Sequence, residues 1–416
     1  MMNTPKVAVL VDLPREAAAG GHVKYWERMA HAAAKEDAPV DLTVYFSGAG
    51  DDEILSPRVR FRFLPPVFST ERLKFLPYVP AHTDLAPFHP QFANELPDYD
   101  VIHTTDGFFA FTRTAERVAR WNDIPLVTSF HTDTPAYAEL FTRQTLQTLL
   151  GRKFGSWLDK AFRISASERA GKEKRLRKHL KNCIRVLAMR PEDVALAQSV
   201  TPTHQIKPMR LGVDKELFAP HVEARAEMER DYGIAPRKFM VLFVGRVDAG
   251  KNMPTLLQAC VEAVEKGIDL HLTVVGVGPM TEEVKQKLKG HVTIVGWVEP
   301  QRLARLYAAA DCLAIASDIE IGGLIGLEAL SCGCPVLVSE KSGVAQLCGD
   351  TEGMQKVESS VEAWVDSLVG LAQDTEKQKA MREAAYVFRR DKLAGWSDVL
   401  GADFIPVWQD VARRNS

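Results

Sequence analysis

Several features that mark other classes of protein are absent from this sequence of 416 residues. No stretch approaches the ~18 consecutive apolar residues that a membrane-spanning helix requires. The first apolar run, Val7 to Val11, is only as long as a strand and is interrupted by Asp12, so we expect no secretory signal. The formal net charge is −2, which gives the chain no bulk positive charge, and we expect no nucleic-acid partner.

Cysteine is scarce, and the few cysteines are scattered, mostly inside apolar runs. This usage is typical of reduced, buried thiols in a cytoplasmic protein. The Cys332-Gly-Cys334 spacing does not fit the usual zinc or thioredoxin patterns, so we expect no metal there. The six cysteines are Cys183, Cys260, Cys312, Cys332, Cys334 and Cys348.

The composition is that of an ordinary globular protein, with 46% hydrophobic and 25% charged residues. Short β-branched runs alternate with helical patterns along the whole chain, which predicts parallel sheets wrapped by helices. The length suits two domains of roughly 200 residues each. The strands that we expect are 7–13, 40–46, 59–64, 101–104, 126–130, 184–188 and 206–211 in the first half, and 239–244, 270–275, 292–295, 312–316 and 335–338 in the second.

We therefore predict two doubly wound, Rossmann-like α/β domains, residues 1–213 and 214–395. The polar segment 214–237, at the start of the second range, is interpreted as the linker. The proline-rich stretch 65–97 has no clear periodicity and is expected to be a long loop region with short helices at most. The final run, 396–416, is expected to be a helix that packs back on the first domain. Doubly wound domains bind ligands at the carboxyl ends of their strands.

The segment Glu320-Ile-Gly-Gly-Leu-Ile-Gly-Leu-Glu328 follows a predicted strand and begins a helix. Its glycines leave backbone N–H groups at the helix N-terminus open to an anion. Carboxylates around such a site can accept hydrogen bonds from sugar hydroxyls. The alternative is an ordinary helix start, where acidic side chains are favoured by the helix dipole.

The segment Val244-Gly-Arg-Val-Asp-Ala-Gly-Lys-Asn252 presents two cations, Arg246 and Lys251, directly after a strand. They could neutralise a diphosphate and stabilise it as a leaving group, or they could form a solvated basic loop. The segment also resembles the P-loop of an NTPase, but Asn252 stands where that loop has the Ser or Thr that binds magnesium. We therefore disfavour the P-loop.

These residues, taken together, resemble family 4 of the glycosyltransferases, which are retaining enzymes of GT-B architecture. Besides the two segments above, Val274-Val-Gly-Val-Gly-Pro279, Val295-Gly-Trp-Val298 and Ala329-Leu-Ser-Cys-Gly-Cys-Pro-Val336 match in the same order. The resemblance is strong over residues 239–342 and looser in the N-terminal half. It implies a hexosyltransferase that moves a hexosyl group from a nucleotide diphosphate sugar to a sugar, a lipid-linked saccharide or a small aglycone.

The resemblance also implies roles for residues of the second domain. Arg246 and Lys251 would bind the diphosphate, Glu328 the ribose hydroxyls and Glu320 the hydroxyls of the transferred sugar. Backbone amides of Gly323 and Leu324 would contact the phosphates and the sugar. The sequence departs from the family at Gly322, where an aromatic residue is common, so the shape of the sugar pocket is left open.

In the first domain, Gly20-Gly21 resembles the family's glycine loop that faces the diphosphate. His131, in the strand end Pro125 to Asp133, resembles the histidine near the reacting centre, where it would bind the sugar or orient the acceptor. His103 ends another strand, and for it a structural role is the stronger interpretation. By analogy with the family, transfer retains the anomeric configuration through front-face displacement.

No metal or other cofactor is expected, because the family uses basic residues at the diphosphate. The Asp98-Tyr-Asp100 pattern marks metal in a different glycosyltransferase fold, but here it precedes a strand, so we interpret it as structural. Residues 163–190 carry ten Lys or Arg against two acids, with Leu176, Leu180, Ile184 and Leu187 at helical spacing. This stretch could be a peripheral membrane contact at the inner face of the membrane, or a solvated helix.

Three other functions share this architecture or these motifs. A nucleotide-sugar epimerase and a phosphorylase are enzymatic alternatives, and a phosphorylase would need a pyridoxal lysine. A module that binds nucleotide sugars without chemistry is the non-enzymatic alternative. The sequence leaves the donor sugar, its base, the acceptor and the oligomeric state open, because a few carboxylates and amides do not select one hexose.

Overall fold

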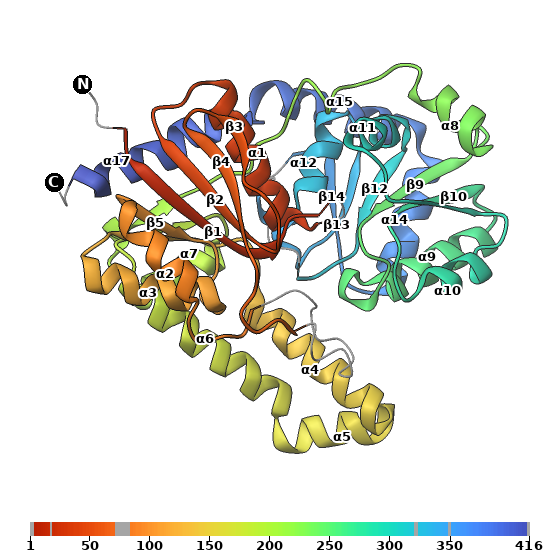
Figure 1. Cartoon of the computed structure of the whole chain (residues 1–416). Coiled ribbons are helices and arrows are strands. Elements are labelled where there is room, and N and C mark those ends of the chain that lie inside the picture. The colour runs from red at the N-terminus through yellow and green to blue at the C-terminus, as the bar shows by residue number, and fades with distance from the viewer. Residues whose placement is uncertain (1–3, 17–18, 71–83, 320–322, 348–350, 414–416) are drawn as a thin grey trace. The chain divides into compact units, whose positions relative to one another are not determined.

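The computed structural model describes residues 4–16, 19–70, 84–319, 323–347 and 351–413. The chain divides into two compact units: Met1–Leu211 with Trp396–Ser416, and Gly212–Gly395. Figure 1 follows the chain through both units by colour. Each unit is a parallel sheet covered by helices, which confirms the expectation of two doubly wound α/β domains.

The first unit contains an eight-stranded sheet with the order β3-β4-β2-β1-β5-β6-β7-β8. All neighbours are parallel except β3, an antiparallel edge strand that the sequence analysis did not predict. Along β1, residues Val7 to Val11 are completely buried, as expected of a parallel strand with helices on both faces. The strands are β1 Lys6–Pro14, β2 Asp41–Ser47, β3 Glu53–Ser56, β4 Val59–Leu64, β5 Val101–Thr104, β6 Leu126–Ser129, β7 Arg185–Ala188 and β8 Ile206–Pro208.

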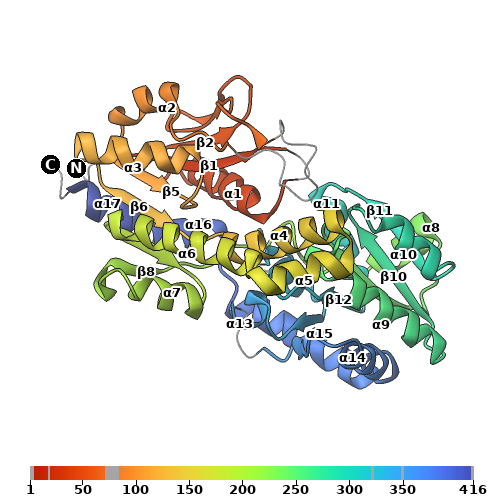
Figure 2. The same ribbon diagram turned by 90° about the horizontal axis from the view of Figure 1, so that it is seen from below.

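Helices cover both faces of this sheet. On one face, a core that includes Phe92, Phe111, Leu176 and Ala197 joins α2, α3, α6 and α7 (Figure 2). On the other face lies α1, followed by the C-terminal helices. The helices are α1 Gly21–Lys35, α2 Pro90–Glu95 with η2 Leu96–Asp98, α3 Ala110–Asn122, α6 Ile164–Asn182 and α7 Pro191–Gln198. Of the proline-rich stretch 65–97, residues 71–83 lie outside the described part.

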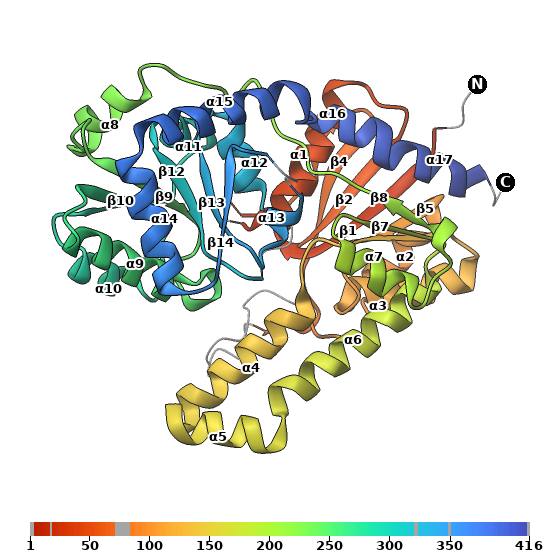
Figure 3. The ribbon, with the colours of Figure 1, turned by 180° about the vertical axis from the view of Figure 1, so that it is seen from behind.

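The C-terminal segment consists of α16 Trp396–Val399, a π-helical turn Leu400–Phe404 and α17 Ile405–Arg413. It belongs to the first unit and lies along the sheet in Figure 3. Asp403 forms a salt bridge with Arg210 at 2.8 Å, and the Trp408 indole donates a hydrogen bond to His103 of β5. These contacts fix the last helix against the strand ends.

Three consecutive helices, α4 Thr134–Leu150, α5 Arg152–Phe162 and α6, form a hairpin that projects from the first sheet (Figures 1 and 3). The leucine and isoleucine spacing predicts one amphipathic helix through Leu187, and this prediction is wrong. Helix α6 ends at Asn182 and Leu187 lies in β7, while Leu176 and Leu180 are buried in the core. The apolar positions of this stretch are therefore used inside the unit.

The second unit contains a six-stranded parallel sheet with the order β11-β10-β9-β12-β13-β14. Its core includes Val241, Leu257, Leu272 and Trp364, all fully buried between strands and helices. The strands are β9 Phe239–Val244, β10 Leu270–Val275, β11 Val292–Gly296, β12 Cys312–Ile315, β13 Val336–Ser339 and β14 Met354–Val357. The helices are α8 Ala224–Tyr232, α9 Met253–Glu265, α10 Thr281–Lys287, α11 Pro300–Ala309, α12 Leu324–Ser331, α13 Gly343–Leu347, α14 Val361–Gln373 and α15 Thr375–Asp391, with the short η4 Ala249–Lys251 before α9.

Candidate functional site

In the second unit, the strand order reverses between β9 and β12. From β9 the chain continues outward to β10 and β11, and then returns to place β12 on the other side of β9. The loops that follow two such strands diverge, which leaves a crevice at their carboxyl ends where ligands of doubly wound domains bind. The β9–α9 loop carries Arg246 and Lys251, and the β12–α12 connection leads to Gly323, the N-cap of α12, and to Glu328 within that helix.

The β9–α9 loop holds its two cations at the strand end. Gly245 has φ +143°, a conformation that side chains rarely adopt, and the Lys251 side chain passes within 3.7 Å of the position that a Gly245 Cβ would take. Arg246 forms a salt bridge with Asp248 at 3.0 Å, yet 64% of its side chain is exposed. Asp248 also accepts a hydrogen bond from the Lys251 backbone N–H. Asp248 therefore orders the loop while the Arg246 guanidinium stays accessible to an anion.

Asn252 connects this loop to the neighbouring strand. Its φ of +52° is left-handed, where asparagine is tolerated better than most residues. Its side-chain amide donates to the Ala316 carbonyl, and its oxygen accepts from Thr255. Ser317 donates to the Gly250 carbonyl at 3.1 Å. These bonds bring the β9–α9 loop beside the end of β12, and they explain why asparagine, not the Ser or Thr of a P-loop, occupies this position.

The glycines of the Val274–Pro279 motif allow two loops to touch. A Cβ on Gly276 would lie 2.1 Å from the Gly245 carbonyl oxygen, and one on Gly278 would lie 2.4 Å from that of Val247. Backbone hydrogen bonds from Gly245 to Val275 and from Gly276 to Gly296 complete the contact. The motifs after β9, β10 and β11 therefore form one hydrogen-bonded rim, which the sequence analysis had treated as separate matches.

Gly323 is the N-cap of α12, with φ +52°. A Cβ there would lie 2.0 Å from a Val344 methyl group, so both backbone and packing require glycine. Leu324 is buried as the first residue of α12, and Glu328 lies one turn further, 2% exposed, with the Tyr307 hydroxyl donating to it at 3.3 Å. Glu320 and Gly322 lie outside the described residues, so the structure gives no placement for the expected sugar contact.

In the first unit, the strand order reverses between β1 and β5. Gly20 is the N-cap of α1, and among the described residues no atom lies within 4 Å of the position that a Gly20 Cβ would take. Gly21 is the exposed first residue of the same helix. Packing inside the unit therefore does not explain the absence of a side chain at Gly20, and the helix N-terminus there is open to an anion.

A chain of hydrogen bonds fixes His131 after β6. The Trp408 indole N–H donates to His103 Nδ1 at 3.0 Å, and His103 Nε2 lies 2.8 Å from the Ser129 hydroxyl. The same hydroxyl lies 2.7 Å from His131 Nε2, to which the Trp26 indole N–H also donates. An indole nitrogen can only donate, so His103 Nδ1 and His131 Nε2 are acceptors. His103 then donates to Ser129, and Ser129 donates to His131.

This assignment places the proton of neutral His131 on Nδ1. Burial, with the nearby His22 and His103, holds the pKa of His131 well below its ordinary value of 6.5, and burial lowers the pKa of His103 to about 3. Both rings are therefore neutral at physiological pH. His131 can donate a hydrogen bond through Nδ1 and is a poor general base. His103 accepts a hydrogen bond from Trp408 and donates one to Ser129, which agrees with the structural role expected of it from the sequence.

His22 is a candidate site residue that the sequence analysis missed. Its ring stacks on His131 with centroids 4.8 Å apart and an interplanar angle of 4°. Burial lowers its pKa to about 3, and its buried Nε2 has no hydrogen-bond partner among the described residues. The sequence signal that could have identified His22 is its position directly after Gly20-Gly21. That position brings His22 to the end of α1 that faces the end of β6.

The other sequence motifs, the Asp98-Tyr-Asp100 pattern and the cysteines, have structural roles. Asp100 accepts a hydrogen bond from the Lys6 backbone, so it joins two strands. The five described cysteines are free and buried, and burial raises the pKa of Cys334 to about 12. Among the described residues, no three His, Cys, Asp or Glu side chains are grouped as metal ligands. In the same part of the chain, none of the helices has the length and apolar character needed to cross a bilayer.

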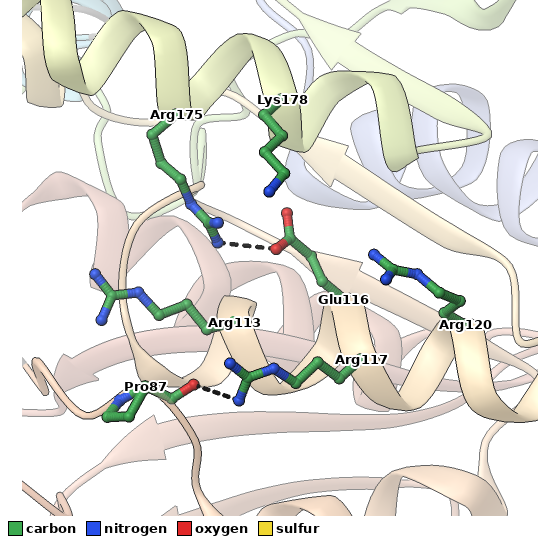
Figure 4. A pocket seen from close by; sticks show the side chains of 7 residues that line it. All are labelled: Pro87, Arg113, Glu116, Arg117, Arg120, Arg175 and Lys178. Atoms are coloured by element: carbon green, nitrogen blue, oxygen red, sulfur yellow. Dashed lines mark hydrogen bonds and ion pairs between the residues drawn. The ribbon is translucent and has the colours of Figure 1, made fainter.

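The first unit also contains two cavities of different character. One, of about 440 Å³, lies between α3 and α6 (Figure 4). Glu116 is its only carboxylate and binds Arg175 at 2.8 Å, so the cavity is positively charged and suits an anion. Its lining is Pro87, Arg113, Glu116, Arg117, Arg120, Arg175 and Lys178. The other, of about 590 Å³, is mainly apolar and extends from His22 and Ser129 along α4 and α6.

Two family profiles match the chain, one in each unit. The profile described as Glycosyl transferases group 1 matches residues 224–388, and the profile described as Glycosyltransferase Family 4 matches residues 19–181. Together they include the loops of the second unit, with residues 320–322 among them, and the strand ends of the first unit described above.

Among curated proteins, the chain is 25% identical over 292 residues to the sulfoquinovosyl transferase SQD2 of Arabidopsis thaliana, which covers 69% of this chain and 52% of SQD2. It is 32% identical over 188 residues to a D-inositol 3-phosphate glycosyltransferase of Corynebacterium aurimucosum, covering 42% of this chain and 44% of that protein. The chain spans about half the length of the curated relatives it matches. Among solved structures, sucrose-phosphate synthase from Thermosynechococcus elongatus matches with a TM-score of 0.69 at 18% identity, covering 99% of this chain and 97% of that one.

Proposed function

The chain belongs to glycosyltransferase family 4 and has the GT-B fold, and we propose that it transfers a hexosyl group from a nucleotide diphosphate sugar to a sugar, lipid-linked or small-molecule acceptor. The observation that supports this proposal best is the β9–α9 loop. It presents Arg246 and Lys251 at the switch point of the second sheet, tied by Asn252 to the strand that leads into α12. Two cations at this position match a diphosphate leaving group.

The residues around α12 would complete the donor site. Backbone amides at Gly323 and Leu324 lie at the start of the helix, where a phosphate or sugar oxygen can accept hydrogen bonds. Glu328, oriented by Tyr307, would bind the ribose hydroxyls. Glu320 would bind the hydroxyls of the transferred sugar. The second unit would therefore bind the donor and the first unit the acceptor.

In the first unit, Gly20 and Gly21 would approach the diphosphate through the N-terminus of α1. His131 would donate its Nδ1–H to a hydroxyl of the sugar or the acceptor, because its network uses Nε2 as an acceptor. This role differs from proton abstraction, for which a pKa near the working pH is favourable. The leaving diphosphate would then accept the acceptor proton in a front-face displacement with retention of configuration.

We further infer that transfer needs neither a metal nor another cofactor, because Arg246 and Lys251 supply the positive charge at the diphosphate. We also infer a cytoplasmic location, because the nucleotide sugar that serves as co-substrate would be supplied there. The acceptor would be a carbohydrate, a lipid-linked saccharide or a small molecule, with no nucleic-acid partner.

Donor binding can be tested by thermal shift with UDP, GDP, ADP and dTDP sugars, with and without a chelator. A ligand at roughly 100 times its dissociation constant stabilises the folded state by about 2.7 kcal/mol. We expect one nucleotide to produce a chelator-resistant shift. Lys251→Ala should weaken its binding by roughly 10- to 100-fold, as expected for the loss of a charge-assisted contact.

The matched control is Lys285→Ala, which removes an exposed lysine of α10 in the same unit. Donor affinity should stay unchanged in this variant. A chain that shows no shift with any nucleotide sugar would not have the donor site proposed here. Binding without hydrolysis or transfer to any acceptor would instead identify a binding module.

A further inference from the structure

Helix α5 lies at the far end of the α4–α5–α6 hairpin and exposes its apolar side chains. Phe154, Trp157, Leu158, Ala161 and Phe162 recur at spacings of three, one, three and one, which places them on one face of the helix. Phe154, Trp157 and Phe162 are 54%, 59% and 66% exposed. The Phe154 and Trp157 rings stack with centroids 5.7 Å apart. A helix of a globular domain normally buries such a face.

The opposite face of α5 is fixed against its neighbours, so the apolar face cannot turn inward. A Cβ on Gly155 would lie 2.4 Å from the Leu146 carbonyl oxygen of α4, which makes glycine necessary for this close packing. Asp159 is buried and accepts hydrogen bonds from the Ser165 backbone and hydroxyl and from Arg143. Burial alone would raise the pKa of Asp159, but these hydrogen bonds lower it below its ordinary value. The charged carboxylate therefore holds α5 in this orientation.

The end of α4 adds exposed apolar side chains to the hairpin. Leu149 and Leu150 are also exposed, so residues 149–162 contain five of the thirteen large hydrophobic side chains that are exposed in the described part of the chain. Such clustering marks an interaction surface, whereas scattered exposed residues need no explanation. We define the tip of the hairpin as residues 149–163.

The charge of the tip indicates its partner. It carries four exposed cations outside the apolar face: Arg152, Lys153, Lys160 and Arg163. The one carboxylate of the tip, Asp159, is buried and hydrogen-bonded to Ser165 and Arg143, so the exposed charge of the tip is positive. Aromatic and aliphatic side chains next to exposed Lys and Arg are typical of helices that lie in the interface of an anionic membrane. A second protein copy would have to offer an acidic apolar surface instead.

The apolar cavity runs along the α4–α6 hairpin to the strand ends of the first unit, near His131. Along the hairpin it is lined by Tyr137, Phe141 and Leu146 of α4 and by Leu176 of α6, and at the strand ends by His22 and Ser129. Its volume of about 590 Å³ is within the range of ligand pockets, roughly 300–1,000 Å³. A cavity with this lining can hold a hydrocarbon chain while a polar group lies near His131.

We propose that the tip of the α4–α6 hairpin docks on an anionic membrane surface and that the apolar cavity holds the hydrocarbon part of a lipid-borne acceptor. The second half rests on the proposed function, whereas the docking does not. The contact lies at residues 149–163 rather than along the basic stretch 163–190. Within that stretch, Leu176 and Leu180 are buried, and Arg169 and Arg177 form salt bridges with Glu173.

Sedimentation with phosphatidylcholine vesicles, with and without phosphatidylglycerol, tests the docking on the full chain without any nucleotide sugar. We expect enrichment on the anionic vesicles only. The double variant Trp157→Ala/Phe162→Ala should bind at least about tenfold more weakly, because two apolar side chains no longer enter the interface. Lys153→Glu/Lys160→Glu should lose a similar factor and much of the salt dependence.

The matched control is Trp121→Ala, which removes a tryptophan of α3 that is 67% exposed in the same unit. Its vesicle binding should equal that of the unchanged chain. Equal binding by the tip variants, or no enrichment on anionic vesicles, would overturn the docking. So would self-association in solution that the tip variants abolish, because a second copy would then cover this face.

Dodecyl maltoside and maltose provide a probe pair for the cavity. We expect the alkyl glycoside, below its micelle concentration, to raise the melting temperature and free maltose to have no effect. Ala138→Trp should fill the cavity from α4 and remove the shift, and Thr142→Trp, one turn further, provides a second filling variant. A shift that survives both substitutions would overturn the cavity assignment. Donor binding is measured in solution without vesicles or detergent, so its failure would leave the docking result intact.

Discussion

At Gly276, the backbone of a neighbouring loop occupies the space where a side chain would begin. Gly276→Ala would place a methyl group 2.1 Å from the Gly245 oxygen at φ +122°. We expect a loss of at least roughly 3 kcal/mol in the free energy of unfolding, from backbone strain and overpacking. Urea denaturation of the full chain measures this loss in the free energy of unfolding. Gly290→Ala, also at positive φ but with no atom within 4 Å, should lose only about 1–2 kcal/mol.

His22 provides a test of pH dependence at a single residue. Its pKa is about 3 in the folded chain and 6.5 when unfolded. Between these values only the unfolded chain binds the proton, so the contribution of His22 to stability falls as the pH drops below 6.5. The stability difference between the unchanged chain and His22→Phe should therefore shift by roughly 2 kcal/mol in favour of the variant between about pH 6.5 and 5.

Urea titrations at both pH values measure this difference. His204→Phe, at an exposed histidine of the same unit, provides the comparison. A difference that does not change with pH would mean that His22 is protonated in the folded chain, and it would also contradict the neutral stack with His131. Burial raises the pKa of Asp12, so this carboxylate changes stability with pH in the opposite sense. It is present in both proteins and therefore cancels in their difference.

At the scale of the elements, helix α17 orients the hydrogen-bonded chain of His103, Ser129 and His131. Trp408 is fully buried and donates to His103 Nδ1. Trp408→Phe leaves that nitrogen without its donor, so we expect a loss of roughly 1–3 kcal/mol beyond the change in packing. Trp364→Phe is the matched control, because Trp364 is equally buried and its indole N–H has no hydrogen-bond partner in the described part of the chain. Thermal unfolding compares the two, and equal losses would contradict a role for the hydrogen bond.

At the scale of the whole molecule, the two units have separate hydrophobic cores. A donor that binds through Arg246, Lys251 and Glu328 should therefore stabilise the second unit. We expect slower hydrogen exchange in β9, β10 and β12 with a nucleotide sugar at saturation, and little change in β2 and β7. Exchange followed by mass spectrometry measures both units in one sample. Protection of equal size in the first unit would show that the donor contacts lie elsewhere or that the cores unfold together.

The strands and the β9–α9 loop were predictable because their signals are local. Long β-branched runs predicted the parallel strands other than β14. The antiparallel β3 and the parallel β14 were missed because the four residues of each carry no such run. Arg246 and Lys251 of the β9–α9 loop stand five residues apart, and Gly245 and Asp248 of the same loop order its backbone. A motif of this kind contains its own geometry, so the sequence alone determines it.

Only the tertiary structure decided which residues surround His131. Its hydrogen-bond chain joins Trp26, His103, Ser129 and Trp408, which are far apart in the sequence, and no local pattern encodes which helix reaches which strand end. The outward face of α5 was equally hidden. Its apolar spacing predicts burial, and only the close packing at Gly155 and the hydrogen bonds to Asp159 turn that face to solvent. The sequence by itself determined the doubly wound sheets and the two cations of the β9–α9 loop, because neighbouring residues fix both. The tautomer of His131 and the exposure of the tip came from packing between distant elements, since contacts at long sequence separation choose among conformations that are equally good locally.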